Sequence, residues 1–139
     1  MNNENMITVE TTIDAPVAKV WKLWSEPDHI TKWNSASEDW HTPFAENDLR
    51  TGGTFRSRME AKDGSFGFDF AGTYTAVVPH SRIEMEFGGR KAVVEFLPEG
   101  PKVLVRETFD GEDTHSVEQQ RQGWQAILDR FARHVESRR

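Results

Sequence analysis

The sequence predicts an α+β fold in which a curved antiparallel sheet packs around one long C-terminal helix. Two short helical segments follow the first predicted strand, and the region from residue 50 to residue 110 then alternates apolar and polar residues with a period of two. The last segment instead places its apolar residues at helical spacing. The chain has 139 residues and no cysteine, which fits one domain, residues 1–139, without disulfides or thiolate metal sites.

The N-terminal segment predicts one strand and two short helices. In MITVETTI, residues 6–13, apolar and polar side chains alternate, which is typical of a strand with one face in water. In residues 14–24, Pro16 suits the first turn of a helix, and the apolar residues that follow recur at helical spacing. Pro27 ends that helix, and residues 27–33 form a second, shorter one.

The central region predicts an antiparallel meander. Its expected strands are residues 54–61, 66–78, 82–87, 92–97 and 102–109. Short turns connect them, including the Asp63-Gly64 dipeptide, which is a frequent hairpin turn, and the Gly88-Gly89 pair. Consecutive strands with such short connections are typically antiparallel neighbours in one sheet.

The final segment predicts an amphipathic helix from about Ser116 to about Glu136. Ser116 and Gln119 form a capping box, and Trp124 and Leu128 belong to its apolar stripe. A sheet with one apolar face has to cover that face, and this helix is the obvious cover. Where a strongly curved sheet does not close on the helix, we expect an apolar cavity.

Composition and charge argue against several classes of function. The formal net charge of −6 disfavours nucleic acid as a partner, because proteins that bind it usually present a basic face. The polar N-terminal residues are unlike a signal peptide, and no apolar run approaches 18 residues, so we expect a cytoplasmic protein without a membrane span. The segment DLRTGGTF matches neither glycine motif for nucleotide binding, and no cofactor is expected.

Four segments of the chain resemble those of a known family, in that family's order. They are IDAPVAKVWKLWSEPDHITKW, DLRTGGTFRSRM, GTYTAVVPHSRIEM and QRQGWQAILDRFARHVE. Together they resemble the START-like helix-grip (SRPBCC) superfamily, and within it the bacterial proteins similar to the activator of heat-shock protein 90 ATPase. The resemblance implies about six or seven strands that grip a C-terminal helix, and a cavity for a lipid, polyketide or aromatic ligand. Because the eukaryotic namesake is a co-chaperone, it also implies a chaperone as an alternative partner.

The predicted inward faces, with the segment before the meander, supply one set of candidate ligand-binding residues. They are Trp33, Trp40, His41, Phe55, Met59, Phe68, Phe70, Tyr74, Met85, Phe87, Glu107, Trp124 and Leu128. The set is rich in Phe, Met and Trp, and such side chains suit an adaptable pocket wall. The alternative for each apolar member is ordinary core packing.

The stretch KWNSASEDWH places two tryptophans in an otherwise polar segment. Trp33 and Trp40 could supply apolar edges of a cavity, while Asn34, Ser37 and His41 form part of a polar rim. The rival hypothesis is a structural loop that the two indoles pin to the body of the protein. We favour the wall and lip of a ligand cavity, although the sequence alone does not separate the two hypotheses strongly.

Glu107 is the strongest polar candidate. In KVLVRETF it shares a face with Val103, Val105 and Phe109, where burial would raise the pKa of its carboxyl. Such a group could orient a ligand or act as an acid or base. The alternatives are a strand end that turns it into water, or an ion pair with Arg106 or an arginine of a neighbouring strand.

Other patterns indicate little chemistry. His41 lies near loop carboxylates, but the spacing matches no established metal site, and no metal is expected. No serine lies in a nucleophile motif such as G-x-S-x-G. Gly123, inside the last helix, predicts either close packing against a strand or space left for a ligand.

Three functions follow from these observations. The first is a binding protein for a small apolar or aromatic molecule, and the sequence favours it over an enzyme. The second is a cyclase or hydratase on the same scaffold, with Glu107, His41 or Tyr74 as acid–base groups. The third is a co-chaperone-like interaction domain, which a large exposed apolar patch would favour.

Overall fold

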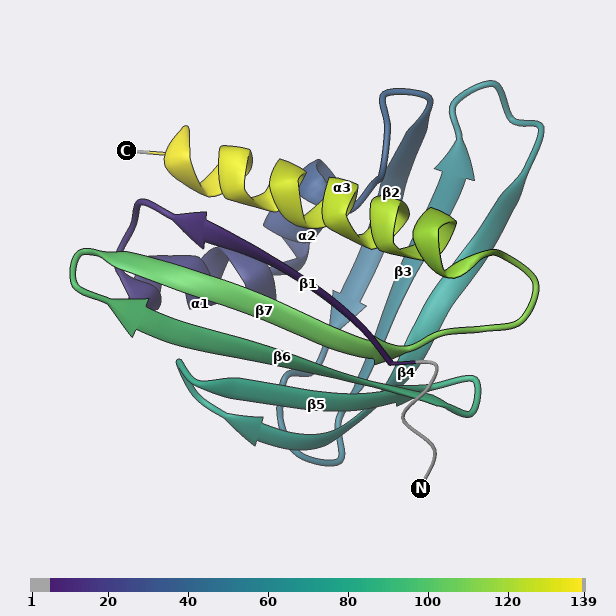
Figure 1. Ribbon diagram of the computed structural model, residues 1–139. Coiled ribbons are helices and arrows are strands. Elements are labelled where there is room, and N and C mark those ends of the chain that lie inside the picture. The colour runs from purple at the N-terminus through teal and green to yellow at the C-terminus, as the bar shows by residue number, and fades with distance from the viewer. Residues whose placement is uncertain (1–5, 139) are drawn as a thin grey trace.

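The computed structural model describes residues 6–138, which form one seven-stranded sheet and three helices (Figure 1). The strands are β1 (Met6–Ile13), β2 (Trp40–Asn47), β3 (Thr54–Ala61), β4 (Gly67–Val78), β5 (Arg82–Phe87), β6 (Arg90–Glu99) and β7 (Lys102–Asp110). The helices are α1 (Val17–Ser25), α2 (Pro27–Trp33) and α3 (Val117–Glu136).

The sheet is antiparallel throughout, in the order β1-β7-β6-β5-β4-β3-β2. Strands β2 to β7 form a meander of consecutive hairpins, and the first strand then pairs with the last. Helices α1 and α2 connect the two edge strands, β1 and β2. This arrangement confirms the predicted α+β helix-grip fold.

Strand β2 is the element that the periodicity did not predict. Its first residues pair with the end of β3, but a bulge between His41 and Phe44 shifts the register, and Pro43 lies inside that bulge. Apolar and polar residues therefore do not alternate regularly along it. A strand with this pattern cannot be recognised from a period of two.

Helix α3 begins and ends close to the predicted residues. The Gln119 amide donates to Ser116 Oγ at 3.1 Å, and the Ser116 amide donates to Gln119 Oε1 at 3.2 Å, which completes the capping box. The stripe that includes Leu128 and Phe131 is buried, and Gln125 Nε2 donates to the carbonyl of Glu10 in β1 at 3.0 Å. Helix α3 thus lies along β1.

Helices α1 and α2 are fixed to each other and to α3 by tryptophans. The Trp33 indole N–H donates to the carbonyl of Leu23 at 3.0 Å, and its ring lies 4.9 Å from that of Trp24. Both rings contact Phe131 of α3, at 4.8 and 5.0 Å. Pro16 proves to be the N-cap residue of α1 and does not lie inside its first turn.

The sheet is strongly curved, and its two halves relate differently to α3. Strands β1, β6 and β7, called the closed half, pack against α1 and α3. Strands β2, β3 and β4, called the open half, run steeply upward at the right of Figure 1 and pass behind α3 in that view, and β5 lies between the two halves. A bulge between Tyr74 and Ala76 bends β4, and Gly72 lets the Phe55 ring lie directly over the strand. The curvature separates the open half from the helix.

None of the helices within residues 6–138 combines the length and the apolar character that a membrane crossing requires.

Candidate functional site

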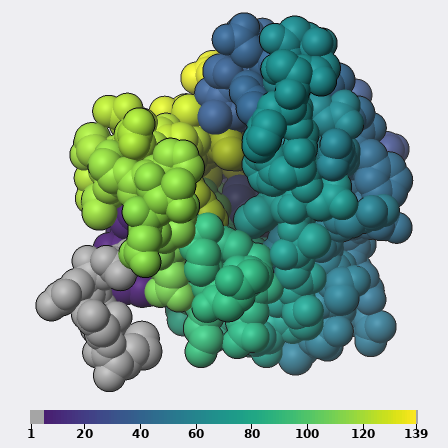
Figure 2. Space-filling model, turned by 90° about the vertical axis from the view of Figure 1, so that its right-hand side faces the viewer, coloured from purple at the N-terminus to yellow at the C-terminus, as the bar shows by residue number. Residues whose placement is uncertain are grey.

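A cavity of about 410 Å³ lies between α3 and the open half of the sheet. In Figure 2 the molecule is hollowed between the segment that leads into α3, the β3–β4 hairpin and the turn between β5 and β6. Its lining residues are Trp24, Ile30, Trp33, Asn34, Glu46, Asn47, Phe55, Ser57, Met59, Phe68, Phe70, Tyr74, Met85, Arg90, Glu107, Glu112, His115, Gln120, Trp124 and Ile127.

Aromatic rings form much of the wall on the sheet side. The Phe55 ring lies 5.5 Å from that of Phe70 and 5.0 Å from that of Tyr74, and Phe70 continues the contact to Phe87 at 5.1 Å. These rings come from β3, β4 and β5, so the alternation of three consecutive strands turns them toward the same side. The result is a continuous apolar surface.

Trp124 supplies the wall on the helix side. Its indole stacks on the Phe109 ring of β7, with centroids 3.7 Å apart and planes inclined by 9°. Its edge also meets Phe70 at 6.4 Å, in a T-shaped arrangement. Trp124 therefore joins the packed closed half of the sheet to the open cavity.

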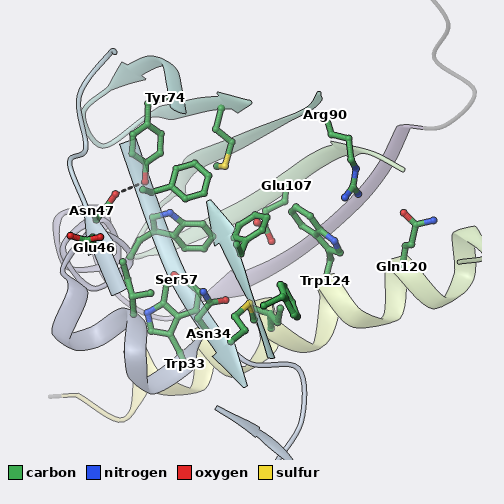
Figure 3. Close-up of a pocket in the computed structure, with 18 of the residues that line it drawn as sticks. Trp33, Asn34, Glu46, Asn47, Ser57, Tyr74, Arg90, Glu107, Gln120 and Trp124 are labelled. Carbon is green, nitrogen blue, oxygen red and sulfur yellow. Dashed lines mark hydrogen bonds between the residues drawn. The ribbon is translucent and has the colours of Figure 1, made fainter. Parts of the chain in front are cut away.

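Half of the lining residues carry polar side chains, and most of these side chains already have partners. The Tyr74 hydroxyl donates to Asn47 Oδ1 at 2.5 Å, and Asn47 Nδ2 donates to the carbonyl of Ser25 at 2.7 Å (Figure 3). Burial raises the pKa of the Tyr74 phenol above its ordinary value, so the hydroxyl remains neutral. This pair is a fixed polar point on an otherwise apolar wall.

Glu107 lies in the middle of the cavity, between Tyr74 at one end and Gln120 at the other (Figure 3). Only 7% of the residue is exposed, and burial alone raises the pKa of its carboxyl from an ordinary value of 4.5 to about 8. Within residues 6–138, no hydrogen bond or neighbouring cation offsets that burial. Arg106, a predicted alternative partner, instead bonds Glu10 at 3.0 Å on the outer face.

The mouth of the cavity carries Arg90 and Gln120, and both side chains are held by backbone carbonyls. The Arg90 guanidinium donates twice to the carbonyl of Asp110, at 3.0 and 2.8 Å. Gln120 Nε2 donates to the carbonyls of Glu112 and His115, at 3.0 and 2.9 Å. These bonds fix the segment between β7 and α3 as one side of the opening.

Nine of the thirteen predicted site residues line the cavity. They are Trp33, Phe55, Met59, Phe68, Phe70, Tyr74, Met85, Glu107 and Trp124. All lie on faces that the periodicity turned inward, except Trp33, which the sequence suggested through its unusual neighbours. Whether they contact a ligand stays a prediction.

The other four predicted residues lie outside the cavity lining. Phe87 of β5 and Leu128 of α3 are core residues, 6% and 0% exposed, because they lie where the sheet and the helix are packed together. His41 lies on the outer face of the bulged strand, with Nε2 3.7 Å from a Glu60 carboxylate oxygen. Trp40 is the first residue of β2 and pairs with Ala61 at the end of β3.

Trp40 belongs to a separate aromatic cluster. Its ring lies 6.0 Å from that of Phe66, which is 62% exposed, and 5.9 Å from that of Phe68, which is 42% exposed and also lines the cavity. Of the two tryptophans in KWNSASEDWH, Trp33 thus both lines the cavity and fixes α2 through its indole N–H, whereas Trp40 does neither. The cavity-wall and structural hypotheses therefore both apply to Trp33, and the cavity-wall hypothesis does not apply to Trp40.

Several lining residues were not among the predicted set. Glu46 and Asn47 were missed because β2 was not recognised as a strand. Ser57 shares the inward face of Phe55 and Met59, so the alternation carried a usable signal for it. The residues that lead into α3 gave no periodic signal, because they belong to an irregular connection.

Two histidines far apart in sequence also meet. His29 of α2 and His134 of α3 are joined by a hydrogen bond of 2.9 Å between Nδ1 and Nε2. Burial, with nearby Arg138, His29 and Lys32, lowers the pKa of His134 to about 4. Among the described residues, no three side chains of His, Asp or Glu are grouped as a metal site.

The sheet, the gripped helix and the cavity between them define a START-like helix-grip protein. Residues 14–136 match the model of the family described as activator of Hsp90 ATPase homolog 1-like protein. The chain belongs to this family, which is part of the START/SRPBCC superfamily. No match was found among the curated proteins.

Two solved structures support the same assignment. The AHSA1-like protein of Aeromonas hydrophila is 46% identical, with a TM-score of 0.89, over 95% of this chain and 92% of that one. Chr148 of Cytophaga hutchinsonii is 49% identical, with a TM-score of 0.84, over 96% of this chain and 93% of that one. Protein NE0264 of Nitrosomonas europaea, at 18% identity over 100% of this chain and 99% of that one, shares the fold with a TM-score of 0.83.

Proposed function

We propose that this protein binds a small apolar or aromatic molecule in the cavity between α3 and the open half of the sheet. The observation that carries the proposal is the combination of an aromatic wall with one unpartnered carboxyl group inside it. Small-molecule sites are typically concave and largely apolar, with a few polar groups that set the orientation of the ligand. The cavity has this composition.

The size of the cavity fits the proposal. Ligand pockets usually measure about 300–1,000 Å³. A volume of about 410 Å³ lies toward the small end of that range and has room for a bicyclic aromatic compound. The mouth in Figure 2 gives such a molecule a route of entry.

We favour binding over catalysis because the acid–base groups named for a cyclase or hydratase do not converge. His41 lies on the outer face of the sheet. The Tyr74 hydroxyl is bonded to Asn47, and Glu107 has no hydrogen-bond partner among the described residues. The proposal therefore gives Glu107 a role in ligand contact and not in proton transfer.

The five indole N–H signals of the protein provide the test. Trp24, Trp33 and Trp124 line the cavity, whereas Trp21 and Trp40 do not. Titration with neutral naphthylethanol should shift the first three signals in ¹H–¹⁵N spectra and leave the other two in place. Equal shifts of all five, or shifts confined to Trp40, would contradict binding in this cavity.

A cavity-filling variant provides the control. Ser57 is 7% exposed and faces the cavity, so Ser57→Leu should occupy part of the space and reduce naphthylethanol affinity by about tenfold or more. Ser65 lies exposed in the β3–β4 turn, and Ser65→Leu should bind as the unchanged protein does. Unaltered binding in a folded Ser57→Leu protein would place the ligand elsewhere.

A further inference from the structure

We propose that the cavity selects ligands that carry one basic nitrogen on an aromatic body, and that the protonated nitrogen docks on the carboxylate of Glu107. This inference rests on the proposed function and narrows its ligand class. It rejects ligands with a carboxylate head group, such as fatty acids. Three features of the site support it.

The first feature is the position of the Glu107 carboxyl. Glu107 lies in β7, the second strand from the β1 edge, opposite Val9 of β1 and Val94 of β6, both of which are buried. Its neighbours on the same face, Val105 and Phe109, are fully buried as well. A carboxyl in such surroundings has lost its hydration without gaining a partner from the protein, and a ligand that supplies one removes that cost.

The second feature is the balance of charge around the cavity. The ionisable groups that line it are three carboxyls, Glu46, Glu107 and Glu112, one guanidinium, Arg90, one imidazole, His115, and the phenol of Tyr74, which remains neutral. The Arg90 donors are directed at the Asp110 carbonyl, and His115 bonds Glu112 at 3.1 Å. Glu46 is paired with Arg56 at 3.0 Å on the outer side.

Glu107 is therefore the lining carboxyl that lacks a partner within residues 6–138. Arg90, the lining guanidinium, lies at the mouth with Nε and Nη2 bonded to the Asp110 carbonyl, and no cation among the described residues lies beside Glu107 to receive a carboxylate head group there. The protein as a whole carries a formal charge of −6, which adds to the attraction for cations and the repulsion of anions.

The third feature is the aromatic surface beside the carboxyl. Phe109 follows Glu107 by two residues on the same face of β7, and Trp124 stacks on Phe109. The indole of Trp124 thus lies next to the position that a docked nitrogen would occupy. Aromatic faces attract cations, and the attraction is stronger when water is excluded.

Binding of an ammonium group should change the protonation of Glu107. The pKa of about 8 keeps Glu107 mostly protonated at neutral pH, while an alkyl amine in water is already protonated. When the ammonium group enters, Glu107 gives its proton to solvent, and a charge-assisted hydrogen bond forms between N–H and the carboxylate oxygen. At pH 7 close to one proton is released for each ligand bound, and fewer are released at pH 8.5, where the carboxyl is already largely ionised.

Three probes with one ring system separate the alternatives. Naphthylethylamine, naphthylethanol and naphthylacetate differ only in a cationic, a neutral or an anionic head group. At pH 8.5, calorimetric titration should give an affinity for the amine about tenfold above that for the alcohol, because a bond to a charged group is stronger than one between neutral groups. The acid should bind more weakly than either.

The pH dependence gives a second readout on the unaltered protein. From pH 8.5 to pH 7 the affinity for the amine should fall roughly five- to tenfold, since a smaller fraction of Glu107 is ionised. The affinity for the alcohol should stay nearly constant. In Glu107→Gln, which keeps the shape but cannot ionise, the amine should lose both its advantage over the alcohol and its pH dependence.

The outcomes distinguish this inference from the proposed function. If the alcohol binds but the amine has no advantage, or if the acid binds best, the selection for a basic nitrogen is overturned and small-molecule binding stands. An amine that binds equally well to Glu107→Gln also overturns the docking site. If none of the three probes binds, both the inference and the proposed function fail.

Discussion

The closed and open halves of the sheet carry similar apolar residues but use them differently. In the closed half, Ile7, Val105 and Phe109 are at most 1% exposed beneath the helices. In the open half, Phe68 is 42% exposed, and Met59 and Phe70 are only half-buried. Strands β3 and β7 both alternate regularly, so the difference in exposure arises from where α3 lies relative to the curved sheet.

The comparison shows that one helix cannot cover a sheet of this width. Helix α3 lies along β1, and the bend of β4 carries the open half beyond its reach. Of the aromatic side chains there, Phe70 reaches α3 only through the edge of Trp124, and Phe68 remains 42% exposed. A surplus of apolar surface inside a curved sheet thus becomes a cavity.

The largest expected difference in stability is between two variants, each of which truncates one aromatic residue in one half of the sheet. Phe109→Ala should lower the free energy of unfolding by about 3–5 kcal/mol, because it leaves a void beneath Trp124. Phe68→Ala should cost less than about 1 kcal/mol, because much of the ring already contacts water. Urea unfolding followed by circular dichroism measures both, and equal losses would contradict the division into halves.

A smaller effect on stability is expected from the carboxyl of Glu107, a residue of the closed half that lines the cavity. The folded state holds the Glu107 proton more tightly than the unfolded state does, because the pKa rises from 4.5 to about 8 on folding. The contribution of Glu107 to stability therefore falls as pH rises from 4.5 to 8. At pH 7, Glu107→Gln should stabilise the protein by about 1–3 kcal/mol.

The matched control for Glu107 is an exposed glutamate. Glu99 lies at the exposed end of β6, so Glu99→Gln should alter neither stability nor its pH dependence by more than about 0.5 kcal/mol. The measurement is the stability difference between variant and unchanged protein from pH 4 to pH 8. A difference that does not grow with pH for Glu107→Gln would mean that its carboxyl is hydrated in the folded state.

The smallest effect concerns two glycines. An added Cβ at Gly123 of α3 would meet no atom within 4 Å, so Gly123→Ala should stabilise the protein by about 0.8–1 kcal/mol through helix propensity. At Gly72 the same atom would lie 2.2 Å from the Glu86 carbonyl oxygen, and Gly72→Ala should be destabilising. Thermal unfolding checks both, and a destabilising Gly123→Ala would mean that the helix face is packed.

Much of the fold followed from the sequence because periodicity reports the face of each element. The strands of the meander and the capped final helix were predicted within a few residues of their bounds. Strand β2 was not, because a bulge and Pro43 interrupt its alternation. The free space beside Gly123 could not be inferred either, since close packing and open space both favour glycine.

For the candidate site, the sequence predicted which side chains face the interior, but not which of them line the cavity. Periodicity placed Phe70 and Glu107 inside, but it could not tell a lined cavity from a filled core. Phe87 and Phe70 contact each other, and only Phe70 lines the cavity. The distinction depends on where α3 runs relative to the sheet, and the pairing of His29 with His134 likewise depends on the approach of two helices.

The pairing of β1 with β7 joins Thr8 to Thr108, 100 positions apart. During synthesis, β1 therefore remains an unpaired edge until nearly the whole meander has left the ribosome. Unpaired edge strands tend to pair with strands of other chains, which leads to aggregation. Its solvent-facing residues Thr8, Glu10 and Thr12 place a charge and two hydroxyls along the exposed side, and such gatekeeper residues protect a waiting strand from aggregation.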